Sequence, residues 1–216
     1  MSVAPGLNSK DVSLVSPASA AWAAVFLAVF AWSAVAPHDR ATWWLEVLPA
    51  LVGFAILALT RTRFPLTPLL YVLILAHAVI LVVGGHYTYA EVPLGDWVRD
   101  WTGSTRNNYD KLGHFAQGFV PAVVARELLI RLGVFARRRW LPFVTVCICL
   151  AISAFYELLE WWAALIAGEG AEAFLGTQGY VWDTQSDMAW ALAGAILALL
   201  ALSRFHDRQL ARIGET

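Results

Sequence analysis

Apolar runs of roughly 20 residues alternate with short polar connections along most of this chain. A helix needs about 20 apolar residues to cross about 30 Å of hydrocarbon. The pattern therefore predicts an all-α, polytopic transmembrane helical bundle. We expect about six spanning helices, at about 18–36, 43–59, 65–85, 110–132, 141–167 and 182–202.

The polar segments divide the chain into a membrane domain and two tails. Residues 1–17 are weakly charged and contain Ser, Pro and Gly, which predicts a flexible tail. Residues 18–204 form the expected six-helix transmembrane domain, and residues 205–216 form a basic tail. Between the third and fourth spans, residues 94–101 carry two tryptophans, which favours a short interfacial helix.

Composition excludes an ordinary soluble domain. The chain has 216 residues, of which 59% are hydrophobic and 14% are charged, whereas soluble domains carry about 25% charged residues. We therefore expect membrane lipids as its surroundings and partners, and no nucleic-acid partner.

The basic residues predict the orientation. One side of the membrane receives ten of them, namely Lys10, Arg61, Arg63, Arg131, Arg137, Arg138, Arg139, Arg204, Arg208 and Arg212. The other side receives four, namely Arg40, Arg99, Arg106 and Lys111. Because short cytoplasmic segments are enriched in Lys and Arg, both termini are expected in the cytoplasm.

The start of the fourth span combines several groups that can carry chemistry. Asp110, His114 and Gln117 are spaced i, i+4 and i+7, so a helix presents them on one face. A carboxylate one turn before a histidine can fix its tautomer. Asp110 as a helix cap and Lys111 as a snorkelling side chain are the simpler alternatives.

Two other spans carry acids at the same depth. Glu157 and Glu160 lie in the outer half of the fifth span, and Asp183 and Asp187 begin the sixth. His86 ends the third span on that side. A charge near the bilayer centre costs about 2.5–3.5 kcal/mol on insertion scales, so these acids need partners, water or an ion. Asp183 as a cap, and one glutamate bonded to a Trp or Tyr, are the structural alternatives.

Other polar positions favour structural roles. His77 lies mid-membrane and alone, as a packing histidine with satisfied hydrogen bonds would, and Arg126 with Glu127 favours an interhelical ion pair. The small-residue pairs Gly118/Ala122 and Ala191/Ala195 predict close packing of the fourth and sixth spans. Residues 176–180 form a Gly-containing loop that could close over the site.

Two kinds of chemistry suit these residues. A divalent metal could be held by His114, Glu157 and Asp187, since imidazole and carboxylate ligands suit Zn, Mn or Fe. The alternative is metal-free acid–base chemistry, in which clustered carboxylates raise one another's pKa values. No zincin, P-loop, Rossmann or Gly-x-Ser-x-Gly pattern is present.

The same motifs carry a resemblance to known families. Residues 109–115, 156–161 and 179–188 resemble the YjdF-type inner-membrane proteins of bacteria, over most of the chain after about residue 18. The resemblance implies a multi-pass protein of the bacterial cytoplasmic (inner) membrane. A more distant similarity is to VanZ-like proteins, at Asp110, Lys111, His114, Glu157 or Glu160, Asp183, Asp187 and Gly194. Neither resemblance implies a particular reaction.

The leading functional prediction is hydrolysis or transfer on a lipid or lipid-linked substrate at an extracytoplasmic site. The candidate catalytic residues are His114, Glu157, Glu160 and Asp187. The candidate binding or orienting residues are Asp110, Lys111, Gln117, Asp183 and His86. A small transporter or a lipid- or drug-binding protein is the alternative, and a structural partner in a larger complex is a third.

Overall fold

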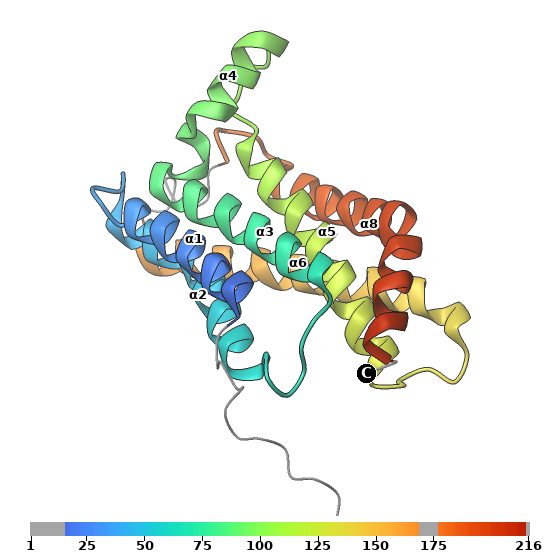
Figure 1. Ribbon diagram of the computed structural model, residues 1–216. Helices are drawn as coiled ribbons and strands as arrows, with labels where there is room; N and C mark the ends of the chain where they lie inside the picture. The colour runs from blue at the N-terminus through green and yellow to red at the C-terminus, as the bar shows by residue number, and fades with distance from the viewer. Residues whose placement is uncertain (1–15, 169–176, 215–216) are drawn as a thin grey trace, which may run out of the picture.

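The computed structural model describes residues 16–168 and 177–214, and it confirms an all-α fold (Figure 1). The helices are α1 (Pro17–Ser33), α2 (Arg40–Thr60), α3 (Pro68–Tyr87), α4 (Pro93–Thr102), α5 (Tyr109–Arg131), α6 (Leu141–Ala167) and α8 (Asp183–Gly214). Two 3₁₀ turns accompany them, η1 (Tyr89–Glu91) and η2 (Arg138–Trp140).

Local sequence explains where the first helices begin. The Ser16 hydroxyl accepts a hydrogen bond from the Ser19 N–H at 3.1 Å, and Pro17 occupies the first turn of α1. Asp39 caps α2 by accepting from the Thr42 N–H at 2.7 Å. That hydrogen bond lowers the pKa of the Asp39 carboxyl below its ordinary value.

Four helices are long and apolar enough to cross a membrane among the described residues: α2, α3, α6 and α8. Helix α1 is apolar but has 17 residues. Helix α5 has 23 residues, carries Asp110, Lys111, His114 and Gln117 in its first turns, and lies between α3, α6 and α8. Because its neighbours shield it, α5 can carry groups that would be costly against lipid.

Helices α5 and α8 meet at nearly bare backbone, as the small-residue pairs predicted. A Cβ atom on Gly118 would lie 1.8 Å from the Ala191 carbonyl oxygen, and one on Gly194 would lie 2.2 Å from the Phe115 carbonyl oxygen. Only glycine permits this approach, because no other residue lacks the Cβ. Ala122 and Ala195 are fully buried in the same core.

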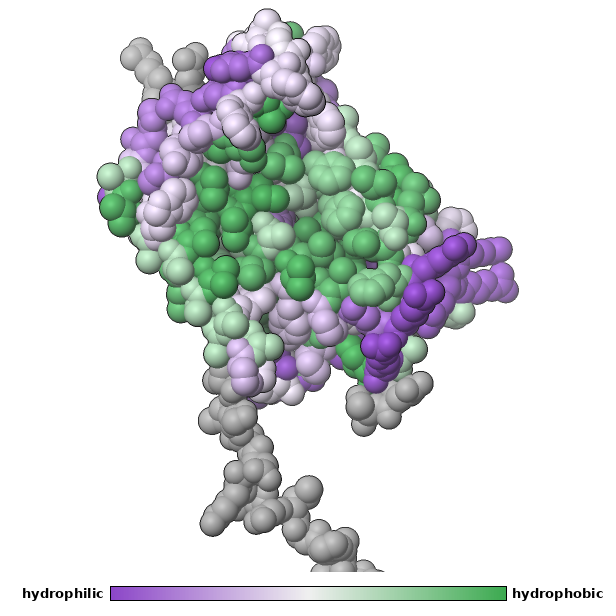
Figure 2. Space-filling view, turned by 45° about the horizontal axis from the view of Figure 1, so that its top comes forward, coloured by the Kyte–Doolittle hydropathy of each residue, from purple (hydrophilic) through white to green (hydrophobic). Residues whose placement is uncertain are grey.

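The surface has the distribution expected for a membrane protein. Figure 2 shows an apolar band between polar regions at the two ends of the bundle. Large apolar side chains such as Leu59, Ile166 and Leu200 are at least three-quarters exposed on the isolated chain. Contiguous apolar patches of this kind are unfavourable in water, and a lipid environment removes that cost.

The two ends of the bundle differ (Figure 1). At one end, which we call the α4 end, α4 projects beyond the bundle with Trp97 and Trp101 largely exposed. The chain's C-terminus lies at the opposite end, where α8 continues to Gly214 rather than ending near Leu202 as expected. Most of the predicted basic tail is therefore helical. Residues 1–15 and the acidic loop residues Glu169 and Glu172 lie outside the described residues.

Candidate functional site

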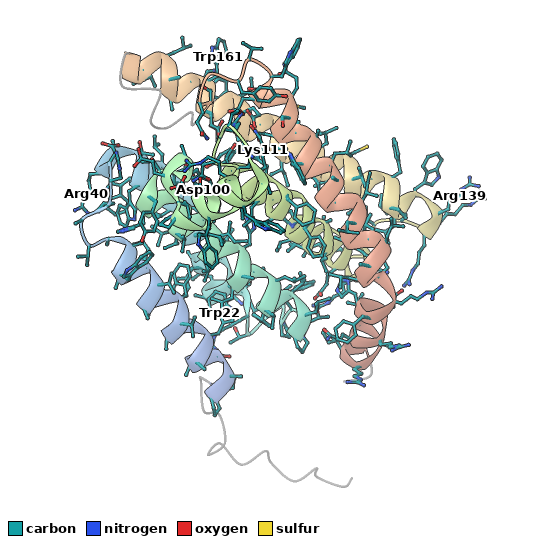
Figure 3. All side chains as sticks on the ribbon, turned by 90° about the horizontal axis from the view of Figure 1, so that it is seen from above. Trp22, Arg40, Asp100, Lys111, Arg139 and Trp161 are labelled. Atoms are coloured by element: carbon teal, nitrogen blue, oxygen red, sulfur yellow. The ribbon has the colours of Figure 1, made fainter. Side chains whose placement is uncertain are left out.

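Lys111 joins the starts of α5 and α8. Its Nζ donates to Asp183 Oδ1 at 2.7 Å and to Asp187 Oδ1 at 2.5 Å, and Asp110 Oδ2 lies 3.5 Å away. In the view from the α4 end, Lys111 lies inside the bundle, whereas Arg139 and Trp161 point outwards at its edge (Figure 3). Lys111 is 7% exposed, so it is a buried counter-ion rather than a snorkelling side chain.

His114 lies one turn deeper and faces acids on both sides of its ring. Gln117 Oε1 lies 3.1 Å from Nδ1 and can only accept, so Nδ1 carries a proton. Nε2 then faces Asp110 Oδ1 at 3.4 Å and Asp187 Oδ1 at 3.9 Å. A lone pair directed at two carboxylates is repelled by both. The geometry therefore calls for a proton or a metal ion at Nε2.

Glu157 lies on the other side of the same ring. Its Oε1 is 3.8 Å from His114 Nδ1, is fully buried, and has no hydrogen-bond partner among the described residues. A buried carboxylate oxygen without a donor is costly, and such atoms are uncommon in stable cores. Glu157 therefore adds an unsatisfied acceptor to a region already rich in negative charge.

A cavity of about 230 Å³ continues from His114 into the bundle. Glu46 from α2 and Glu160 from α6 line it together with Asp110, His114 and Tyr156. The Tyr156 hydroxyl donates to Glu46 Oε2 at 3.3 Å, and Glu46 is only 4% exposed. The cavity thus brings the buried Glu46 and the partly buried Glu160 to the same site.

Tyr89 forms another wall of this cavity. Its ring occupies a notch between Gly84 and Gly113, where added Cβ atoms would lie 2.5 Å and 2.8 Å from the ring carbons. Burial raises the pKa of the Tyr89 phenol well above its ordinary value, so its hydroxyl stays neutral.

The segment before α8 lies over the site. Gln178 Oε1 accepts from the Asn107 N–H at 3.0 Å, and Gln178 Nε2 donates to the Asn107 carbonyl at 2.8 Å. The Tyr180 ring lies 5.9 Å from Lys111 Nζ and 5.2 Å from the Arg106 guanidinium carbon. The described part of the predicted closing loop, residues 177–180, therefore contacts the residues around α5. Gly176 lies outside the described residues.

We call this set of residues the acidic cluster: Glu46, Arg106, Asp110, Lys111, His114, Glu157, Glu160, Asp183 and Asp187. It contains six carboxyl groups and two permanent cations, Arg106 and Lys111. Even with His114 protonated, acids outnumber cations. In a region of low dielectric constant, this excess requires bound protons, water or a further cation.

Three donor atoms of this cluster suit a metal ion. Ligand atoms of Asp110, His114 and Asp187 all lie within 4.8 Å of one another. Ligands about 2.0–2.2 Å from a tetrahedral Zn²⁺ ion lie about 3.3–3.6 Å apart, so these side chains would have to move slightly closer together to hold an ion. His114 and Asp187 belong both to this donor set and to the one expected from the sequence. The third ligand differs: Asp110 takes the place of Glu157, which faces the other nitrogen of the His114 ring.

Most of the candidate residues chosen from sequence lie together. One connected network of contacts contains Asp110, Lys111, His114, Glu157, Asp183 and Asp187, while Gln117 contacts His114 and Glu160 lines the cavity. His86 lies elsewhere, with its Nδ1 2.9 Å from the Ser33 carbonyl and its ring against Trp32. The third span turns His86 towards α1, which periodicity alone did not reveal.

His77 differs from its expected role. It was expected to be a packing histidine with satisfied hydrogen bonds, but its buried Nε2 has no partner among the described residues. It lines the deep end of the cavity, which explains why no neighbouring side chain reaches it.

Sequence reasoning missed Glu46 and Arg106 as site residues. Glu46 is the one acid within an otherwise apolar span, which is itself a signal of function. Arg106 lies in the loop before α5, with Nη2 2.9 Å from Asp183 Oδ1. No sequence pattern connected that loop to the start of α8.

A second group of charges lies towards the opposite end, and we call it the paired cluster: Thr67, Arg126, Glu127, Arg131, His206 and Asp207. Glu127 accepts from the Thr67 hydroxyl, Arg131 and His206 Nε2 at 2.8, 2.8 and 2.9 Å. Arg126 donates to His206 Nδ1 at 3.0 Å and to Asp207 at 2.5 Å. The expected interhelical ion pairing of Arg126 and Glu127 is thus confirmed, with partners on α8 and before α3.

His206 shows how completely this cluster is paired. A guanidinium group can only donate, so His206 Nδ1 accepts from Arg126 and Nε2 carries the proton given to Glu127. His206 and Glu127 are both fully buried. The two acids Glu127 and Asp207 balance the two cations Arg126 and Arg131.

The fold and the buried charges define a multi-pass helical membrane protein with a polar site at one end. Residues 18–208 match the family described as "Predicted membrane protein (DUF2238)", and the chain belongs to that family. It is 56% identical over 187 residues to the inner membrane protein YjdF of Escherichia coli (strain K12), which covers 86% of this chain and 89% of the relative. The match supports the predicted inner-membrane location. No solved structure matches the chain.

Proposed function

We propose that the acidic cluster is the active site for hydrolysis or group transfer on a lipid or lipid-linked substrate. The observation that carries this proposal is His114, whose Nε2 faces two carboxylates while Gln117 holds Nδ1. A histidine that carries a proton at Nε2 and is held in place by acids is suited to give that proton to a leaving group, while a neighbouring carboxylate accepts one from water or from an acceptor hydroxyl.

The neighbouring residues have complementary roles in this proposal. Glu157, whose Oε1 has no donor among the described residues, or Glu160 takes the proton of the attacking group, and His114 gives its Nε2 proton to the leaving group. Asp110 and Asp187 stabilise the imidazolium before the transfer, and Lys111 keeps Asp183 and Asp187 in place. The excess of carboxyl groups supports this division, because it keeps the imidazole protonated and leaves a carboxylate to accept a proton.

A divalent metal held by Asp110, His114 and Asp187 would activate water at the same place. Metal analysis of the purified protein and of a His114→Ala variant tests this form. We expect a stoichiometric metal in the parent protein and its loss in the variant. If neither protein contains metal, the metal-dependent mechanism is wrong and the metal-free acid–base mechanism is retained.

The catalytic proposal is tested by turnover. The protein in lipid nanodiscs is incubated with a bacterial lipid extract, and the lipids are compared by mass spectrometry. We expect one lipid species to be consumed by the parent protein and by a His38→Asn control, and not by His114→Asn. His38 is half-exposed and pairs with Glu91, away from the cluster. Equal consumption by His114→Asn, or no consumption by any protein, would contradict the proposal.

The proposed orientation places the α4 end outside the cytoplasm. The support is the sequence count, which assigns ten basic residues to the side of the termini and four to the side of α4. To test the orientation, the two native cysteines are replaced and a single cysteine is introduced at position 101 in the exposed helix α4. The variant is then labelled in intact cells. Labelling by a membrane-impermeant reagent is expected, and protection until lysis would reverse the orientation.

Proton transport is a second candidate, favoured by the depth of the cavity. The cavity extends from Asp110 to His77, whose Nε2 has no partner, and to Pro121. A path of this kind suits a proton relay. Proton flux into vesicles containing the protein, lost in a His77→Leu variant, would favour transport over catalysis.

A further inference from the structure

A second hollow lies beside the acidic cluster, and we call it the groove. It has a volume of about 750 Å³ and opens between the loop before α5, Tyr180, and the first turns of α5 and α8. Arg106 and Lys111 line it, but Asp183 and Asp187 do not. The two cations of the cluster therefore form part of the groove wall, whereas Asp183 and Asp187 do not line it.

Arg106 is the least satisfied side chain in this groove. Its Nε, Nη1 and Nη2 atoms are all buried and make no hydrogen bond within the described residues. Nη2 lies 2.9 Å from Asp183 Oδ1 without the alignment of a hydrogen bond, and that oxygen already accepts from Lys111. A guanidinium group carries five N–H donors, so several of them lack an acceptor.

A buried guanidinium group without acceptors is costly, and an anion would relieve that cost. The planar donor fork of arginine matches the oxygens of phosphate and carboxylate groups. The Tyr180 ring, 5.2 Å from the guanidinium carbon, restrains its position from one side. Lys111 supplies a second positive charge, and Ser186 supplies a neutral donor in the same groove.

The rest of the groove is apolar. Leu112, Phe115 and Trp190 line it, and the Phe115 and Trp190 rings contact each other at 6.4 Å between centroids. Trp190 is 46% exposed on the isolated chain. These residues belong to the membrane helices α5 and α8, so this wall continues towards the lipid. A free anion would need the polar part alone, whereas a lipid would use both parts.

We propose that the groove binds the phosphate head group of an anionic lipid, with Arg106 as its anchor and Leu112, Phe115 and Trp190 along its chain. An anionic lipid would then be the substrate class of the acidic cluster, and this part of the proposal rests on the proposed function. The bound head group lies next to Lys111, which connects the groove to Asp187 and His114. The reacting bond is thereby brought to the edge of the acidic cluster.

Binding without turnover tests the inference. Phosphatidic acid, diacylglycerol with the same acyl chains, and inorganic phosphate are titrated separately onto the detergent-purified protein. The His114→Asn variant is included so that no reaction is needed. We expect phosphatidic acid to bind, diacylglycerol to bind at least about tenfold more weakly, and inorganic phosphate to bind weakly or not at all.

Variants identify the anchor. Arg106→Gln should weaken phosphatidic acid binding by about tenfold or more, and Arg106→Lys should weaken it less, because it keeps the charge without the fork. Arg99→Gln is the matched control, since Arg99 is half-exposed on α4 and pairs with Asp96 and Asp100. Melting temperatures of all variants show which are folded. Arg106→Lys keeps the test valid if Arg106→Gln does not fold.

Three results would overturn the inference. These are equal phosphatidic acid binding by the parent protein and both Arg106 variants, equal binding of diacylglycerol, or inorganic phosphate binding as tightly as phosphatidic acid. The last result would indicate a soluble anion instead of a lipid. Failure of the catalytic proposal is separate, because it would leave phosphatidic acid bound to Arg106 with no lipid consumed.

Discussion

The acidic cluster and the paired cluster both lie between α5 and α8, and both contain a buried histidine among charged groups. In the paired cluster, the buried Glu127 accepts from three side chains, and His206 uses both ring nitrogens. In the acidic cluster, six carboxyl groups share two permanent cations, and Glu157 Oε1 has no donor among the described residues. Cavities adjoin the acidic cluster, where Asp110, Lys111 and His114 are among the lining residues.

Under the proposed function, the difference separates a structural use of buried charge from a functional one. Paired charges stabilise one arrangement and leave nothing for a ligand to satisfy. Unsatisfied charges cost stability and are retained where binding or chemistry uses them. We therefore expect substitutions in the paired cluster to lower stability, and substitutions in the acidic cluster to alter function with less effect on stability.

The largest effect is expected at Gly118, which lies on α5 between the two clusters. In Gly118→Val, the added side chain overlaps the Ala191 carbonyl, so α5 and α8 must separate and both clusters lose their partners. We expect a cost above about 3 kcal/mol and the loss of most folded protein. Gly53→Val is the control, since nothing lies within 4 Å of a Cβ at Gly53. Equal melting temperatures in the two variants would contradict the close α5–α8 contact.

Glu127→Gln is the next test. The neutral amide leaves Arg131 without a carboxylate and gives His206 and the Thr67 hydroxyl a poorer acceptor. The expected loss is about 2 kcal/mol, measured by thermal or denaturant unfolding in detergent. Glu91→Gln, at an exposed carboxylate, should change stability far less. If both variants unfolded alike, the paired cluster would not be the stabilising region we describe.

Asp39 tests whether a charged group stabilises the fold because its hydrogen bonds are satisfied or because of the end of the bundle at which it lies. It lies at the α4 end but is satisfied as the cap of α2, so Asp39→Ala should cost about 1 kcal/mol. Because the pKa of the folded-state carboxyl is lowered, its contribution is complete above the unfolded pKa of about 3.9 and fades as pH falls through the folded value. The stability difference between parent and variant should therefore be constant near neutral pH and shrink in acid. A difference that grew in acid would contradict this account.

The smallest change in stability is expected for Glu157→Gln. The amide keeps the shape of the side chain, removes one negative charge from the excess, and offers a donor towards the crowded oxygens. We expect unfolding to change by no more than about 0.5 kcal/mol, while His114-dependent lipid conversion is lost. A loss of stability as large as that of Glu127→Gln would remove the distinction between the two clusters.

Much of the fold follows from the sequence, because length and hydropathy directly determine membrane spans. The start of α5 was predictable as a site for a related reason, since Asp110 and His114 are costly in an apolar helix without partners. The continuation of α8 was not, because Arg204, Arg208 and Arg212 mark the end of an apolar run rather than the end of a helix.

The parts of the site that were missed depend on contacts between distant segments. Glu46 reaches the cavity because of the rotation of α2, and His86 turns away because of the rotation of α3. Arg106 depends on how a loop folds back over α8. Periodicity shows which residues share a face, but it does not show which neighbour that face meets.

Tyr89 has a consequence for how this protein can move. Its ring fills a notch made by Gly84 of α3 and Gly113 of α5, and this interlocking fixes the axial position of one helix against the other. For α3 to slide along α5, the Tyr89 ring would first have to leave the notch. Opening of the cavity around His114 by movement of α3 against α5 is therefore opposed by a contact that depends on two glycines.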